Sequence, residues 1–113
     1  MLKKKIKIPI YFGDLILIQS DDFEGLSEKY ELKDLPAFDA VVFPKHLKNG
    51  YTVYYLIVKE EVHPKIIAHE VVHIVNNIYH DRGIDLDVLN DEPQAYLTGW
   101  VTEQCYKYLK IKI

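Results

Sequence analysis

The residues with the clearest chemical potential are His69, Glu70 and His73, which form an H-E-x-x-H pattern in a stretch that is expected to be helical. Four residues are about one helical turn, so both imidazoles project from one face with the carboxylate of Glu70 beside them. Such a face can hold a zinc ion and place a carboxylate next to the water that the metal activates. The alternative is a helix whose two histidines are satisfied surface or core groups.

A zinc ion held by two histidines needs a third protein ligand, and a catalytic site leaves the fourth position to water. Glu92 is the first choice, because it begins the next expected helix and a short loop can return it to the first one. Residues at three- and four-residue spacing continue the same side of this helix, and they are Tyr96, Gly99 and Glu103. We expect this line of residues, the Glu92 line, to face the helix that carries His69 and His73. Glu92 could instead be a first-turn acid that the helix dipole favours. Three nearby acids are alternative ligands: Asp85, Asp87 and Asp91.

The helix that carries the H-E-x-x-H pattern divides into a polar and an apolar face. At 100° per residue, His69, His73 and His80 fall within about 40° of one another. The apolar positions on the opposite side are Ile67, Val71, Ile74 and Ile78. We therefore predict that the histidine face is separate from the hydrophobic core. The other two histidines, His46 and His63, are expected to be solvated loop side chains.

Four expected strands precede two long helices. Apolar residues that alternate or run continuously predict strands at 3–12, 14–19, 38–43 and 51–59. A hairpin turn is expected at Gly13-Asp14, a short helix around 23–32, and long helices over 64–81 and 91–109. Strands first and helices last indicate an α+β fold, in which a small, mostly antiparallel sheet of about four strands is followed by two packed helices.

Length and composition limit the classes of function. The chain has 113 residues, which fits one domain spanning 1–113 with strands mainly in 1–59. A net charge of −3 gives no reason to expect nucleic acid as a partner. No apolar window is long enough to predict a membrane span. Because the one cysteine, Cys105, allows no disulfide framework, a cytoplasmic protein is expected, and its oligomeric state is left open.

Two segments together resemble a known family. Residues 69–73 (HEVVH) and 90–96 (NDEPQAY) are similar to the two-part signature of gluzincin metallopeptidases, in which a glutamate on the next helix completes H-E-x-x-H. The short chain and its segment 92–100 resemble minimal gluzincin-like proteins, including small ones found in phage and mobile-element genomes. The resemblance covers about residues 51–109.

The resemblance implies a zincin-like minimal catalytic core that binds Zn²⁺ through His69, His73 and Glu92. Glu70 would be the general base and later the proton donor in peptide-bond hydrolysis. The substrate would be a peptide or an unfolded segment of a protein.

Larger gluzincins also take an oxyanion donor from a further subdomain and bind substrate along a sheet edge. Without that subdomain, Tyr96 and His80 are the local candidates for the donor. Either 38–43 or 51–59 could be the edge strand, or both could be interior. The alternative to a peptidase is a zinc-containing binding or regulatory module that keeps the site and has little turnover.

Overall fold

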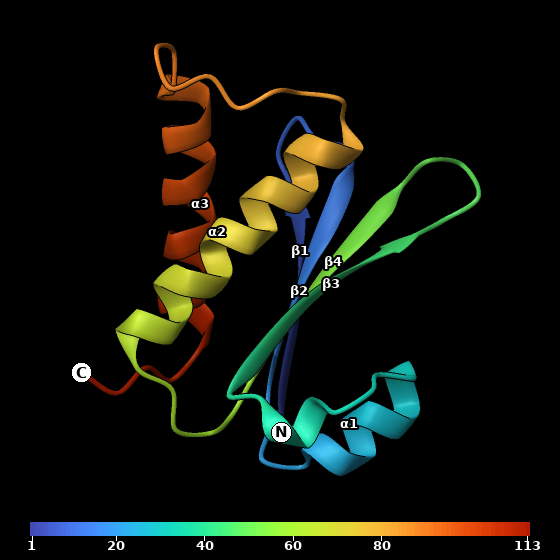
Figure 1. The fold of residues 1–113 in the computed structure, drawn as a ribbon. Coiled ribbons are helices and arrows are strands. Elements are labelled where there is room, and N and C mark those ends of the chain that lie inside the picture. Colours follow the sequence, from blue (N-terminus) through green and yellow to red (C-terminus); the bar gives the residue numbers. More distant parts are fainter.

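The computed structural model describes the backbone of residues 1–113 and all side chains except that of Pro36. The chain forms the expected α+β fold, in which a four-stranded sheet is followed by two packed helices (Figure 1). The strands are β1 (Leu2–Ile8), β2 (Gly13–Gln19), β3 (Ala40–His46) and β4 (Thr52–Val58). The helices are α1 (Phe23–Tyr30), α2 (Pro64–Asp81) and α3 (Glu92–Tyr108), with a short 3₁₀ turn at Leu35–Ala37.

The strand order is β1-β2-β4-β3, so β1 and β3 are the two edges of the sheet. β1 pairs antiparallel with β2, and β3 pairs antiparallel with β4, whereas β2 and β4 are parallel. A parallel pair needs a long connection, which here contains α1 and β3. Of the two segments considered for the sheet edge, the one that forms β3 is the edge and the one that forms β4 is interior.

Each face of the sheet has its own hydrophobic core, because alternate residues of a strand point to opposite faces. Figure 1 shows α2 and α3 side by side, whereas α1 lies at the lower end of the sheet. The buried strand residues packed with α2 and α3 are Ile8, Leu15, Leu17, Ala40, Tyr54, Leu56 and Val58. Those packed with α1 are Ile16, Ile18, Tyr55 and Ile57.

α2 begins at Pro64, a residue suited to the first helical turn because the N–H that it lacks would have no helical partner there. The four apolar positions predicted to face the core are at most 1% exposed: Ile67, Val71, Ile74 and Ile78. His69, His73 and His80 are exposed on the other side. The predicted separation of the histidine face from the core is therefore confirmed.

The hairpin between β1 and β2 turns earlier than expected. Residues 9–12 form the turn, with Ile10 and Phe12 in the left-handed region at φ 71° and 47°, and Gly13 already belongs to β2. A Cβ at Gly13 would lie 2.5 Å from the carbonyl oxygen of Thr52 on β4. The turn expected at Gly13 was wrong, because this glycine allows two strands to approach closely and does not supply a positive φ.

His46 lies at the end of β3, so its expected position in a loop was also wrong. Its Nε2 atom is 3.1 Å from Oδ1 of Asp81, the last residue of α2. The hydroxyl of Tyr54 on β4 donates a 2.8 Å hydrogen bond to Oδ2 of the same carboxylate. Burial and this hydrogen bond raise the pKa of Tyr54 to about 12. These contacts fix the C-terminal end of α2 to both strands of the β3–β4 hairpin.

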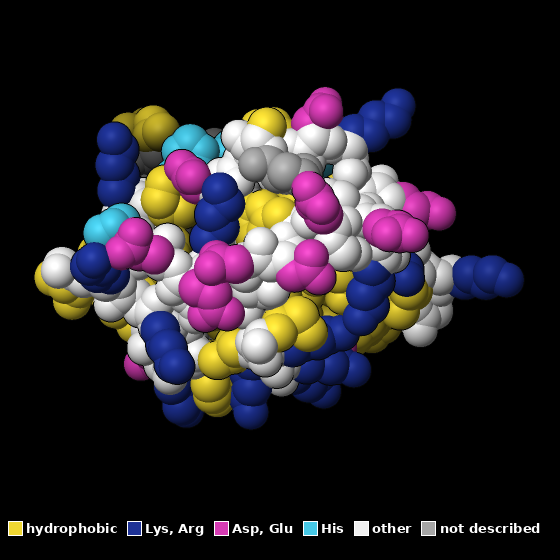
Figure 2. Space-filling model, turned by 90° about the horizontal axis from the view of Figure 1, so that it is seen from below, with side chains coloured by type: hydrophobic (Ala, Val, Ile, Leu, Met, Phe, Trp, Pro, Cys, Tyr) yellow, Lys and Arg dark blue, Asp and Glu magenta, His cyan; other side chains and the backbone are white. Residues whose placement is uncertain are grey.

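The surface carries charged side chains of both signs. In Figure 2, which views the molecule from below, Asp and Glu are spread over the middle of the face and Lys and Arg gather along its lower edge. Apolar side chains are visible between them. None of the described helices is long and apolar enough to cross a membrane.

Gly13→Ala is expected to lower the free energy of unfolding by about 1–3 kcal/mol, because the added Cβ forces β2 and β4 apart. Gly99→Ala in α3 is the matched control, since outside the adjacent residues and backbone of its own helix no heavy atom lies within 4 Å of the position that its Cβ would take. This change is expected to raise the free energy of unfolding by about 0.5–1 kcal/mol. Urea denaturation measures both values, and equal effects would contradict the close approach at Gly13.

Candidate metal centre

The imidazoles of His69 and His73 lie against one another on the exposed side of α2. Their Nε2 atoms are 3.2 Å apart, and their ring centroids are 4.9 Å apart. Two nitrogen ligands of a tetrahedral zinc ion are about 3.4 Å apart when each Zn–N bond is about 2.0–2.1 Å. An N–H···N hydrogen bond between neutral rings has a similar length. The pair therefore fits two corners of a zinc tetrahedron, and measuring bound zinc separates the two explanations.

Glu70 lies beside this pair but points toward the interior. Its side chain is 10% exposed, and Oε1 is 3.9 Å from Nε2 of His69. Burial raises the pKa of the Glu70 carboxyl, and the adjacent imidazoles of His69 and His73 offset part of that rise. A raised pKa makes a carboxylate better able to hold a proton taken from water, as a general base must.

The histidine pair and Glu70 line a groove of about 310 Å³ between α2 and the segment that enters β3. The groove residues on the β3 side are Phe38, Ala40, Val41 and Val42, and Asn77 lines it from α2. The Nδ2 atom of Asn77 donates a 2.8 Å hydrogen bond to the carbonyl of His73. Because β3 is an edge strand, its outer backbone groups are not paired within the sheet. The groove thus joins a potential metal site to a strand that can pair with an extended peptide.

Glu92 is not brought together with the two histidines. In the described chain, no group of three or more His, Cys, Asp or Glu side chains is arranged to hold a metal ion. Figure 1 shows the first turn of α3, which begins at Glu92, well above the middle of α2. The three alternative zinc ligands are also exposed, and none belongs to a metal-binding group in the described chain: Asp85, Asp87 and Asp91.

The expectation that the Glu92 line of α3 faces the histidine helix was wrong. The residues of that line are exposed: Glu92, Tyr96, Gly99 and Glu103. The side of α3 that packs into the protein consists of Leu97, Val101, Gln104 and Cys105. Leucine and valine gain more from burial than glycine does, so they determine the rotation of the helix. Gly99 therefore lies on an open surface of α3 and not in a close contact with another helix.

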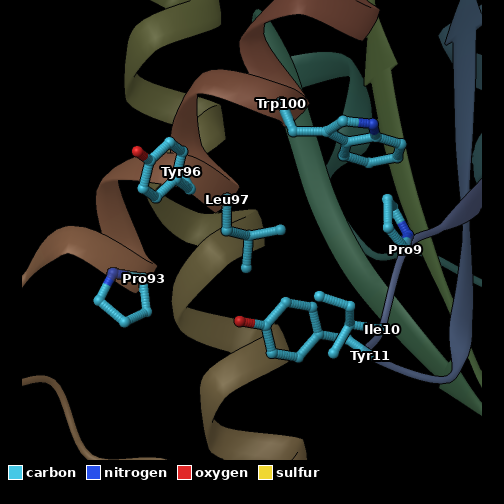
Figure 3. A pocket seen from close by; sticks show the side chains of 7 residues that line it. All are labelled: Pro9, Ile10, Tyr11, Pro93, Tyr96, Leu97 and Trp100. Atoms are coloured by element: carbon cyan, nitrogen blue, oxygen red, sulfur yellow. The ribbon is translucent and has the colours of Figure 1, made fainter.

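Tyr96 and His80, the two candidate oxyanion donors, do not line the groove with the histidine pair. Tyr96 is 76% exposed and lines a separate apolar pocket of about 370 Å³ between the β1–β2 turn and α3. Figure 3 shows Trp100 beside Pro9 in that pocket. His80 is exposed in the last turn of α2. The structure therefore brings neither side chain to the groove.

In comparisons with known proteins, no protein-family model, no curated protein and no solved structure matches this chain.

Glu70→Gln is expected to raise the Tm of the metal-free protein by about 2–5 °C at pH 7. The amide keeps the shape of the side chain and removes a charge whose burial is unfavourable. Glu28→Gln, at an exposed position of α1, is the control and is expected to shift Tm by less than about 1 °C. Calorimetry after chelator treatment measures both, and a lower Tm for Glu70→Gln would show that the carboxylate stabilises the fold.

His73→Ala is expected to weaken zinc binding by at least about a hundredfold, because it removes one of the paired imidazoles. Glu92→Gln is expected to change the affinity by less than about threefold, since this carboxylate lies apart from the pair. Isothermal titration with zinc chloride compares the two variants. A similar loss of zinc affinity in both variants would show that Glu92 is a ligand and would contradict its separation from the histidine pair.

Proposed function

We propose that this protein is a zinc-dependent hydrolase of peptide bonds, with His69 and His73 as metal ligands and Glu70 as the general base. The observation that carries the proposal is the groove in which the histidine pair and a buried carboxylate lie beside an edge strand. The substrate is an extended peptide or an unfolded protein segment, which can pair with β3 through backbone hydrogen bonds.

The proton transfers in this proposal belong to Glu70. Zinc held by His69 and His73 would lower the pKa of a bound water toward about 7. Glu70 takes a proton from the attacking water and passes it to the amine that leaves. The Glu70 side chain lines the same groove as β3 and is 10% exposed, which supports its role as a base beside a peptide paired with that strand.

The second candidate function is a zinc-containing binding or regulatory module with little turnover. The separation of Glu92 from the histidine pair favours it, because the residues that the structure describes then supply two adjacent zinc ligands and not three. The exposure of Tyr96 away from the groove favours it as well, because the groove then lacks this oxyanion donor. Both functions use the same two imidazoles, and they differ in whether Glu70 transfers protons.

We propose that the protein acts in the cytoplasm. Cys105 is buried, and burial raises the pKa of its thiol to about 12, so the thiol packs in the core and is not reactive. A fold that relies on no disulfide suits a reducing compartment.

Glu70→Gln is expected to retain zinc and to lower cleavage of a mixed peptide library by at least about a hundredfold, because an amide cannot accept the proton of water. Mass spectrometry of the library detects new termini, and elemental analysis of the same samples reports zinc. Equal cleavage by the wild type and Glu70→Gln would contradict the hydrolase. Zinc retention without cleavage by either protein would favour the binding module.

A further inference from the structure

The exposed side of α2 differs from that of the other helices because it carries no Lys, Arg, Asp or Glu over about four turns. Between Lys65 and Asp81 the exposed residues are Ala68, His69, Val72, His73, Asn76 and His80. Glu70, the acidic residue within this stretch, is buried. Charged residues exposed on α1 and α3 include Glu24, Glu28, Glu103 and Lys107. A helix face that meets only water usually carries such charges, so the α2 face has the composition of a contact surface.

Ala68, Val72 and Asn76 form a line along this face at a spacing of four residues, which places them one above another. Val72 is at the middle of the line and is 53% exposed. These side chains are uncharged and short, so they let a second helix approach closely. His69 and His73 run alongside it, so a helix that docks on the line meets the histidine pair.

The histidine pair supplies two of the four ligands that a tetrahedral zinc ion takes. Within the part of the chain that the structure describes, no third side chain completes a metal-binding group. A second copy of the chain carries the same pair, and two pairs related by a two-fold axis supply four imidazoles. Between Lys65 and Asp81 each face exposes no charged side chain, so a contact between two copies along this stretch brings no like charges together.

We propose that zinc bridges two copies of this chain through His69 and His73 of each, with the two α2 faces packed about a two-fold axis. This inference rests on the proposed binding of zinc by the histidine pair. In the bridged dimer four imidazoles fill the coordination sphere, so no position remains for water, and the partner helix covers the groove that holds Glu70. The dimer is thus a latent form of the proposed hydrolase, and the monomer is the form with an accessible groove.

The test titrates the chelator-treated chain of residues 1–113 with zinc chloride alone, at micromolar chain concentrations. Sedimentation velocity reports the mass, and elemental analysis reports the zinc bound to each species. The expected product is a dimer with about one zinc per two chains, which chelator returns to monomer. A monomer with one zinc per chain would overturn the bridged dimer and leave the proposed function intact. A chain that binds no zinc would overturn both.

Val72→Glu separates the packing of the helices from the binding of the metal, because it keeps both histidines. Two glutamates facing each other across the two-fold axis are expected to lower the dimer association constant at least about tenfold. Val88→Glu is the matched control, since Val88 is 86% exposed and lies outside α2. Equal dimerisation of the two variants, or a dimer that survives chelation, would overturn the inference.

Discussion

The burial of one face of α2 against the sheet is the interaction on which the candidate site depends. Ile67, Val71 and Ile74 are at most 1% exposed, and each such side chain contributes roughly 1.5–3 kcal/mol on burial. Because a helix turns by a fixed angle per residue, burying this face sets the rotation of every other side chain. The backbone positions of His69 and His73, whose Nε2 atoms are 3.2 Å apart, are therefore set by the core and not by a flexible loop.

Rotation alone does not place the histidines beside β3, since the axis of α2 must also be fixed. At the C-terminal end, Tyr54 of β4 donates a hydrogen bond to Asp81 at 2.8 Å. Before the N-terminal end, the carbonyl of Val62 accepts a 2.8 Å hydrogen bond from the backbone N–H of Lys112. The two ends are thus tied to different parts of the fold, one to the β3–β4 hairpin and one to the C-terminal segment. A groove built between a helix and an edge strand keeps its width only when both ends of the helix are held.

The sequence predicted those features that depend on local spacing and missed those that depend on which elements meet. The bounds of α2 and the exposure of its histidines follow from the period of its apolar residues, so both were predicted correctly. On α3, Gly99 was compatible with a close helix contact and with an open surface, and only the packing of Leu97 and Val101 decides between them. The contact between His46 and Asp81 joins residues far apart in the chain, and no local pattern encodes it.

Glu70 is the position at which the sequence departs most clearly from what the fold requires. Its neighbours on the buried side of α2 are apolar, and a carboxylate there carries a desolvation cost that an apolar residue would avoid. The contact with His69 at 3.9 Å is longer than a hydrogen bond and compensates only part of that cost. A buried charge that does not stabilise the fold is expected where the residue has a chemical role. Here the same stretch of helix also pairs two imidazoles at the separation of zinc ligands, so the proposed zinc site would account for both the unfavourable carboxylate and the histidine pair.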